Sequence, residues 1–304
     1  MSVVDISRRG LISGLGLLAV STITAEGSLA EPAAALATAA APLGPGANGT
    51  AVSGEARTIE RFIRMRSSPD LSPVMWLYHG VLMGKLEGQL ARPLVGVGGM
   101  SFTRAVRRAA GVYNWELDEV GYYLDLHSGE VLPQWLNPYT NKLVKPAHYR
   151  APEHMQYSGD GVKSYDPVPP GADFRGEITT LAEVGGVVTM TEDLYVRIPG
   201  ASATSSAAAA PDRVLASLGS FTAQAAALAA APSRWVDCQM NYATMNSFAR
   251  WLGMDGMAGV QNMRLSGAKR PASDLAAIPA WLRARIDAEH PTFLEVPRNW
   301  AGQH

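Results

Sequence analysis

Short runs of aromatic and β-branched residues, each broken by turn residues, recur between residues 74 and 198. Such runs predict strands, and their close spacing favours an antiparallel meander. We expect strands over 74–86, 92–108, 121–126, 130–137, 142–150, 177–186 and 187–198. The predicted fold class is therefore mainly β (α+β): a curved or closed antiparallel β-sheet or barrel-like domain with a few peripheral helices, including a C-terminal one.

Two tight turns divide the segment 121–150. The first contains His127, Ser128 and Gly129, and the second runs from Pro138 to Asn141. Gly129 and Asn141 tolerate the positive φ that tight hairpins require. We therefore expect three consecutive strands between residues 121 and 150.

Two segments depart from the strand pattern. Residues 202–234 are rich in alanine, and the part from 211 to 231 predicts a helix. That helix either covers the sheet or belongs to a poorly ordered insertion. Near the C-terminus, a second helix over 278–290 places Trp281, Leu282 and Ile286 on one face, which predicts packing against the sheet.

The first 30 residues read as an export signal. Arg8 and Arg9 precede an apolar run from residue 11 to 23, and Ser28-Leu29-Ala30 provides a small-x-Ala cleavage site. The arginine pair resembles a Tat signal. The alternatives are an ordinary Sec signal and an uncleaved anchor, although the apolar run is shorter than the ~20 residues of a spanning helix. We expect a periplasmic or otherwise exported protein.

The composition changes twice along the chain. Residues 31–56 are mostly Ala, Gly and Pro, cannot bury enough apolar area to fold, and predict a disordered linker. Residues 57–304 have a globular composition and fit a single domain. The net charge of −1, without a basic cluster, argues against nucleic-acid binding. The single cysteine, Cys238, excludes an intramolecular disulfide, and we expect it to be buried.

Sequence motifs of common cofactors are absent. No H-x-H, H-E-x-x-H, G-x-S-x-G or phosphate-binding loop occurs, and the glycines of 96–101 lack the dinucleotide-binding spacing. His148 and His154 are six residues apart with Pro152 between them, which does not suit a metal site. We therefore predict no metal and no cofactor.

Polar and aromatic side chains gather in the segment 121–139. On an extended strand, Tyr123 and Asp125 share a face, and across the hairpin Trp135 and Asn137 point to one side, which predicts a pleated surface with all four on one face. Such a surface is either a hydrogen-bonded polar core or the wall of a ligand pocket. The two alternatives remain open from the sequence.

Histidines are scarce, and His148 is our candidate proton carrier because its ordinary pKa lies near neutrality. We expect Tyr123 and Asp125 to orient it, and these three residues form the predicted catalytic group. The predicted substrate-binding residues include Arg250, which would neutralise a carboxylate or enolate, and Trp251 beside it. The remaining predicted substrate-binding residues are Trp135, Asn137, Tyr139 and His79.

Residues 119–148 read EVGYYLDLHSGEVLPQWLNPYTNKLVKPAH. This segment resembles the hallmark of the DUF1838 family, in which E-V-x-x-Y-x-D-P-x-T-G-E-x-L-x-x-W-x-N-P-W-T-G-E-x-V leads to a histidine. Segments 248–270 and 278–297 are similar to two further regions of that family. The resemblance covers most of residues 60–297, so 57–304 is interpreted as one DUF1838-like domain. The family is defined by sequence and implies no established reaction.

Two functions from different classes remain. One is a cofactor-independent enzyme, a lyase, isomerase or cyclase, doing acid/base chemistry on a small apolar or aromatic molecule in a β-lined pocket. The other is an exported small-molecule or lipid-binding protein with no catalysis. Only the enzyme needs a titratable group with a perturbed pKa beside an oriented polar partner. We expect no nucleic acid and no stable membrane insertion after signal cleavage, and leave an oligomer open.

Overall fold

The computed structural model describes residues 51–301 except 69, 167–170, 200–211 and 232–234. The predicted export signal and residues 31–50 of the predicted linker lie outside this range.

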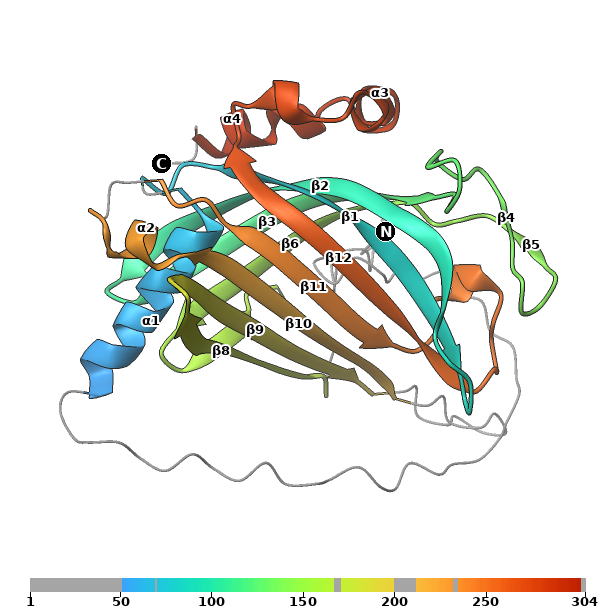
Figure 1. Cartoon of the computed structure of the whole chain (residues 1–304), viewed down its shortest axis with the longest axis horizontal. Helices are drawn as coiled ribbons and strands as arrows, with labels where there is room; N and C mark the ends of the chain where they lie inside the picture. The colour runs from blue at the N-terminus through green and yellow to red at the C-terminus, as the bar shows by residue number, and fades with distance from the viewer. Residues whose placement is uncertain (1–50, 69, 167–170, 200–211, 232–234, 302–304) are drawn as a thin grey trace, which may run out of the picture.

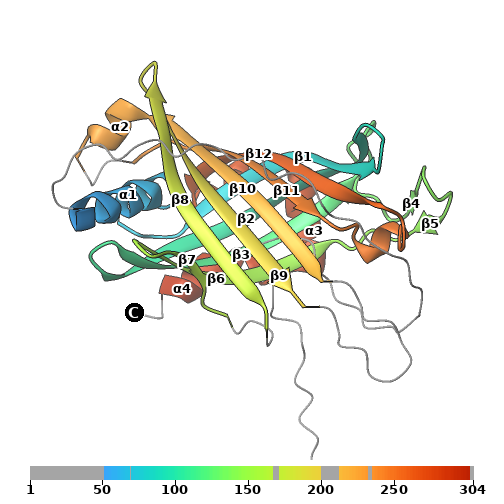
Figure 2. The ribbon, with the colours of Figure 1, turned by 90° about the horizontal axis from the view of Figure 1, so that it is seen from below.

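The described chain forms a closed antiparallel barrel of ten strands, in the order β1-β12-β11-β10-β9-β8-β7-β6-β3-β2 (Figures 1 and 2). The predicted fold class is confirmed. The barrel strands are β1 (Val74–Leu86), β2 (Arg92–Ala109), β3 (Val112–Leu124), β6 (Tyr149–Ser158), β7 (Gly161–Ser164), β8 (Asp173–Val184), β9 (Val187–Ile198), β10 (Arg213–Gln224), β11 (Gln239–Asn246) and β12 (Gly259–Pro271).

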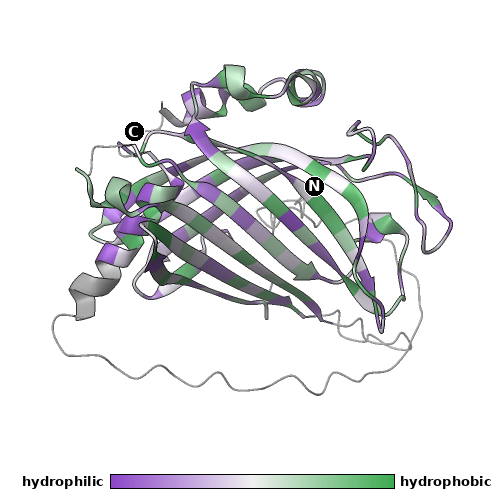
Figure 3. Ribbon diagram, in the orientation of Figure 1, coloured by the Kyte–Doolittle hydropathy of each residue, from purple (hydrophilic) through white to green (hydrophobic). Residues whose placement is uncertain are grey.

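Residues alternate between the inside and the outside of the barrel, because side chains on a strand point to opposite faces in turn. In Figure 3 the strands accordingly show alternating hydrophobic and hydrophilic bands. On β3, the buried residues Trp115, Leu117 and Tyr123 belong to two interior clusters. Glu119 lies between Leu117 and Tyr123 on this same face, so the strand carries a carboxyl group into the interior.

Two paired glycines make room for interior tyrosine rings. Gly99 on β2 lies opposite Gly121 on β3. A Cβ atom at Gly99 would lie 2.5 Å from the Tyr78 hydroxyl, and one at Gly121 would lie 2.1 Å from Cζ of Tyr149. Only glycine permits such close approach of a ring to the backbone. Tyr78 and Tyr149 are held at this level of the barrel as a result.

Helix α1 (Ala51–Arg66) closes one end of the barrel (Figure 2). Its apolar residues Ile59, Phe62 and Ile63 have the spacing of one helix face and join the interior cluster that includes Phe221. The helix begins at Ala51 and so includes residues 51–56, the last part of the predicted linker. Its last residue, Arg66, is buried inside the barrel.

The other end of the barrel holds a second apolar cluster, which includes Tyr123, Leu252 and Met254. The three consecutive strands predicted over 121–150 are much shorter than expected. Residues 121–124 are the end of a longer strand, β3, which pairs with Val131 through a single bridge at Leu124, and β4 (Trp135–Leu136) and β5 (Leu143–Val144) form a separate two-stranded sheet. The two turns are as predicted, since Gly129 and Asn141 have positive φ values.

The predicted C-terminal helix is confirmed as α3 (Ala280–Glu289). Leu282 and Ile286 are buried against Met100, Phe102 and other outward residues of the barrel wall. Trp281 lies over the same wall, where its ring contacts that of Tyr122. Figure 1 shows α3 and α4 (Val296–Ala301) together on the outside of the barrel. Short 3-10 turns occupy Arg250–Leu252, Leu275–Ala277 and Phe293–Glu295.

The helix predicted over 211–231 is wrong for most of its length. Residues 213–224 form the barrel strand β10, and only α2 (Ala225–Ala229) is helical. Burial explains the difference: Leu215, Ser217, Phe221 and Ala223 are buried at period two and face the interior. Tertiary packing has overridden the helix propensity of alanine. Residues 202–211 of the predicted insertion lie outside the described range.

Among the residues that the structure describes, none of the helices has the length and apolar character needed to span a bilayer.

Candidate functional site

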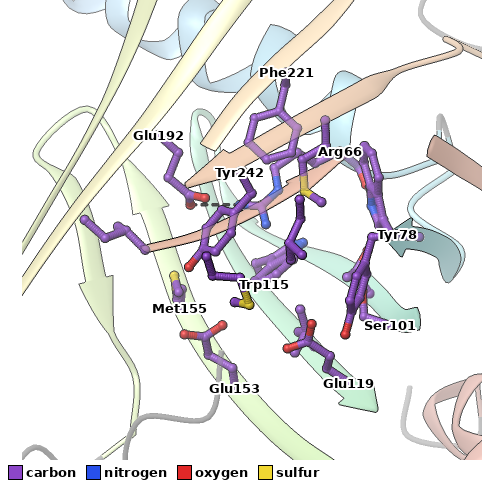
Figure 4. Close-up of a pocket in the computed structure, with 17 residues that line it drawn as sticks. Arg66, Tyr78, Ser101, Trp115, Glu119, Glu153, Met155, Glu192, Phe221 and Tyr242 are labelled. Carbon is purple, nitrogen blue, oxygen red and sulfur yellow. Dashed lines mark hydrogen bonds and ion pairs between the residues drawn. The ribbon is translucent and has the colours of Figure 1, made fainter. Parts of the chain in front are cut away.

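A cavity lies inside the barrel, between the apolar cluster under α1 and the cluster at the opposite end (Figure 4). It is lined by 17 residues and has a volume of about 60 Å³, counted as space for the centres of water molecules. One water needs about 10–15 Å³ on this measure. The cavity therefore has room for a few waters or a small ligand. Its charged or hydroxyl-bearing lining residues, tyrosines aside, are Arg66, Ser101, Thr103, Glu119, Glu153 and Glu192.

Glu119 and Glu153 project into the cavity from neighbouring strands. In the β3–β6 register, Glu119 lies opposite Ala151 and Glu153 lies opposite Leu117, so the two acids are diagonal neighbours on the interior face. Both residues are buried, with 8% and 9% of their surface exposed. In Figure 4 their carboxyl groups point into the space between the walls.

The pKa of the Glu119 carboxyl is raised to about 7. Burial is the main cause, because removal from water disfavours the charged form. The nearby hydroxyl of Tyr78 favours the charged form and offsets part of this effect, while the charge of Asp118 adds to it. Glu119 can consequently hold or release a proton near neutral pH.

The pKa of Glu153 is raised well above its ordinary value. Burial is again the first cause, followed by the charges of Glu192 and Glu119, which the Arg66 charge opposes. Among the described residues, no side chain or backbone group forms a hydrogen bond with this carboxyl. Glu153 is thus favoured in its neutral form and faces the cavity as a proton donor.

Glu192, the third acid, is neutralised by Arg66. Nη1 of Arg66 lies 2.8 Å from Oε1 of Glu192, and both side chains are buried. The hydroxyl of Tyr157 accepts a hydrogen bond from Arg66 and donates one to Glu192, each 2.5 Å long. The Arg66 guanidinium also stacks on Trp115, with Cζ 3.9 Å from the ring centre. This group is a buried charge pair, in which Nη1 of Arg66 is hydrogen-bonded and Nε has no hydrogen-bond partner among the described residues.

A pair of tyrosines borders Glu119. The Tyr78 hydroxyl donates to the carbonyl oxygen of Val120 at 3.0 Å and lies 3.2 Å from the hydroxyl of Tyr149. Burial raises the pKa of both tyrosines, and the charge of Glu119 adds to the effect. They therefore stay neutral, and can orient a ligand by hydrogen bonds rather than by charge.

The predicted proton carrier, His148, directly precedes β6 in the chain and lies beside the end of β3. The backbone N–H of Tyr123 donates to its Nδ1 at 3.2 Å, so Nε2 carries the hydrogen and donates to the carbonyl oxygen of Leu132 at 3.1 Å. Burial lowers the pKa of His148. Both ring nitrogens are used by the backbone, and the residue is not among those lining the cavity. Its catalytic role stays a prediction.

The other two residues of the predicted catalytic group lie apart from the cavity lining. Tyr123 is buried in the cluster at the far end of the barrel, with its ring centre 4.5 Å from that of Trp251. Asp125 lies in the turn after β3, where its carboxylate accepts the N–H groups of His127 and Ser128. These bonds lower its pKa. Among the described residues, Asp125 forms no hydrogen bond or ion pair with His148, and it stabilises a turn.

The predicted substrate-binding residues fall into two groups. Trp135, Trp251 and Tyr139 pack in the far-end cluster. Asn137 is buried and donates from its amide to the carbonyl oxygen of Leu252 at 2.6 Å, while its side-chain oxygen accepts the Tyr139 N–H. The second group comprises His79 and Arg250, which are exposed. The structure brings the first group together, but none of the six lines the cavity.

The acids of the cavity escaped the sequence prediction, although a signal was present. Glu119 and Glu192 each interrupt an apolar face of period two: Leu117 precedes Glu119, and Met190 and Leu194 flank Glu192. An acid on an otherwise buried face of a strand indicates a functional or paired carboxyl. Glu119 also opens the family-like segment 119–148. The strand prediction began at residue 121 and so missed it.

Neither the cysteine nor a metal cluster adds to the site. Cys238 is buried and free, as predicted, and burial raises the pKa of its thiol to about 12. Within the described part of the chain, no three His, Cys, Asp or Glu side chains lie close enough together to hold a metal ion.

Comparison with known proteins identifies the family of this chain and no individual relative. The chain matches no curated protein and no solved structure with significant similarity. Residues 72–304, which include every strand of the barrel, match the family described as DUF1838, protein of unknown function. The chain therefore belongs to the DUF1838 family, whose function is unknown.

Proposed function

We propose that the protein is a cofactor-independent enzyme, of lyase, isomerase or cyclase type, that moves protons on a small apolar or aromatic molecule inside the barrel. Glu119 is the group that carries the proton. The observation supporting this is a buried carboxyl, facing a cavity, whose pKa is raised to about 7. General acid–base catalysis is most effective when the pKa lies near the working pH.

Glu119 acts as the general base and Glu153 as the general acid. As carboxylate, Glu119 accepts a proton from a carbon or oxygen atom of the substrate. Glu153, held neutral by burial and by neighbouring charges, donates a proton to the atom that gains the electron pair. Two carboxyl groups with different pKa values are a common basis for assigning the base and the acid. The tyrosine pair beside Glu119 fixes the position of the reacting oxygen.

The walls of the cavity suit this chemistry. Trp76, Phe221 and Tyr242 present aromatic surface to an apolar substrate. The apolar clusters at both ends keep bulk water away, which strengthens each electrostatic interaction inside. The Arg66–Glu192 pair is internally neutral and leaves the other two acids to act.

Hydrogen exchange tests the proposal without knowledge of the natural substrate. The protein is incubated in D₂O with small ketones and aldehydes, with and without an ammonium group, and deuterium uptake at carbon is followed by NMR. We expect deuterium exchange in at least one of these ketones or aldehydes, at a rate whose pH dependence is centred near 7. Glu119→Gln should lower the rate by about 10²–10⁴, the usual share of general acid–base catalysis. Glu183→Gln, on the exposed surface of β8, should leave it unchanged.

Absence of exchange throughout the panel, or equal exchange by Glu119→Gln, would contradict the enzyme proposal. The alternative is an exported small-molecule or lipid-binding protein. One observation favours it: apolar side chains close the cavity at both ends, as in a site that retains its ligand. Saturable binding of panel members without exchange would support that alternative.

We also propose that the protein is exported to the periplasm or beyond. The support is the sequence alone: the Arg8-Arg9 pair, the apolar run and the Ser28-Leu29-Ala30 site. Changing Arg8 and Arg9 to Lys should trap the precursor in the cytoplasm if the Tat route is used. Unimpaired export of this variant would favour the Sec route, and cytoplasmic location of the parent protein would contradict export.

A further inference from the structure

The cavity holds more acidic than basic side chains. Three of its lining residues are glutamates, and Arg66 is the one Lys, Arg or His residue among the 17. Arg66 pairs with Glu192 at 2.8 Å. Glu119 and Glu153 remain without a cationic partner in the lining. A ligand that enters the cavity therefore meets two acids and no free positive charge.

Arg66 shows how this interior accommodates a cation. Its guanidinium is held by a carboxylate on one side, and on the other it stacks on Trp115 and Phe221, at 3.9 and 4.8 Å from the ring centres. Aromatic faces attract cations electrostatically, and the attraction strengthens away from water. Carboxylate plus aromatic face is thus a combination that stabilises positive charge inside this barrel.

The same combination recurs around the other two acids. Glu119 and Glu153 are more than nine-tenths buried and point into the cavity (Figure 4). No described group forms a hydrogen bond with the Glu153 carboxyl. Trp76, Tyr78 and Tyr242 supply the aromatic surface beside them. A buried carboxyl without a cationic partner keeps its proton, and a cationic donor beside it would favour the ionised form.

We propose that the ligand of this cavity is a small organic cation, whose ammonium group lies between Glu119 and Glu153 and whose apolar part lies against Trp76, Tyr78 and Tyr242. This inference rests on the proposed function, because it names the substrate class of the same site. The ammonium N–H groups donate to the two carboxyl groups, and the charge-assisted bonds satisfy both. The cavity volume of about 60 Å³ limits the ligand to a small amine.

The charge of the site separates this ligand from its analogues. An anion of the same shape would meet a like charge whenever Glu119 or Glu153 is ionised, and like charges in a buried site repel strongly. A neutral alcohol would replace a charge-assisted hydrogen bond by an ordinary one, which is roughly half as strong. The order of affinity is therefore cation, then alcohol, then carboxylate.

Cation binding should release protons, because the ammonium group favours the ionised carboxyl groups. The affinity should thus rise with pH between about 5 and 8, across the pKa of about 7 of Glu119. The other titratable groups that influence these two acids act in the same interior or beside it. They are Tyr78, Asp118 and Tyr149 near Glu119, and Arg66, Asp166, Glu192, Tyr157 and Tyr242 near Glu153.

Isothermal titration calorimetry tests the proposal with three ammonium probes: ethylammonium, isobutylammonium and benzylammonium. Each is compared with the matched alcohol and the matched carboxylate, using the full-length protein. We expect at least one ammonium probe to bind about tenfold or more tightly than its alcohol, with proton release that depends on the buffer. The variant Glu119→Gln/Glu153→Gln should lose this preference, and Glu183→Gln should keep it.

An ammonium probe that binds no better than its alcohol, for all three sizes, would overturn the proposal. This comparison uses the parent protein and stays decisive even if the double variant fails to fold. The outcome is also separate from that of the enzyme proposal. Ammonium selectivity without hydrogen exchange would retain the ligand class and contradict catalysis, whereas exchange of neutral ketones alone would retain catalysis and contradict the ligand class.

Discussion

Arg66, the last residue of α1, forms a 2.8 Å ion pair with Glu192 on β9 inside the barrel. The helix that closes the barrel is thereby tied to the wall by charge as well as by apolar packing. Both side chains are almost fully buried, at 7% and 4% exposure. Loss of either partner leaves the other charge without compensation in a site that water scarcely reaches.

Arg66→Met should therefore destabilise the protein by about 3–5 kcal/mol, the usual cost of breaking a buried ion pair. Urea unfolding followed by tryptophan fluorescence measures the loss. Arg107→Met is the matched control, because Arg107 forms an exposed ion pair with Glu60. Its removal should cost at most about 1 kcal/mol. Similar losses in the two variants would contradict a buried role for Arg66.

The stability of the protein should depend on pH through Glu119. In the unfolded chain this carboxyl ionises near its ordinary pKa of 4.5, whereas in the folded protein it keeps its proton until about pH 7. The folded state thus binds more protons in this window, and the free energy of unfolding falls as pH rises from 4.5 to 7. The total effect is about 3 kcal/mol.

Glu119→Gln removes this dependence. The free energy of unfolding of the variant minus that of the parent protein should be larger at pH 8 than at pH 5, by up to about 3 kcal/mol. Urea unfolding of both proteins at the two pH values measures this difference. Glu183→Gln, an exposed acid on β8, should show no such difference. A stability difference between Glu119→Gln and parent that is the same at pH 5 and pH 8 would contradict the raised pKa.

Gly121→Ala should disturb the tyrosine pair beside Glu119. The new methyl group would lie 2.1 Å from Cζ of Tyr149, which forces the ring away from its position 3.2 Å from the Tyr78 hydroxyl. Overpacking of this kind costs about 1–3 kcal/mol. In a double-mutant cycle with Tyr149→Val, the combined cost should be smaller than the sum of the single costs. Additive costs would show that the ring is not the obstacle.

The sequence predicted the barrel better than its individual elements. Runs of aromatic and β-branched residues identified β1, β2 and β9 closely. Exposed positions alternate with buried ones along the second half of β9, whereas β2 is buried on both faces over most of its length. β10 was mistaken for a helix because small alanines fit both structures, and the choice depends on neighbours distant in sequence, on β9 and β11. Local propensity cannot report such pairing.

The candidate site depended even more on distant contacts. Six of the nine predicted residues lie in 121–148, whereas the cavity combines Arg66, Glu119, Glu153 and Glu192 from four elements. Glu119 and Glu153 become neighbours only through the β3–β6 register. The sequence showed each acid on an apolar face, but only the closed barrel shows that the faces meet.

His148 supplies the last prediction, because its surroundings indicate a structural role that can be separated from catalysis. Its ring joins the end of β3 to the following loop, through Tyr123 N–H and the carbonyl oxygen of Leu132. His148→Ala leaves both backbone groups without a partner and should cost about 1–3 kcal/mol, measured by thermal or urea unfolding at pH 7.5.

Burial lowers the pKa of His148, so in the unfolded chain it binds a proton below pH 6.5 while the folded state resists protonation. The stability gained from His148 is thus complete above pH 6.5 and declines as pH falls, and the gap between parent and variant should narrow at pH 5. His127→Ala, in the exposed turn nearby, is the control and should change stability little at either pH. Parent-like stability of His148→Ala at pH 7.5 would contradict this role and favour the original interpretation of His148 as proton carrier.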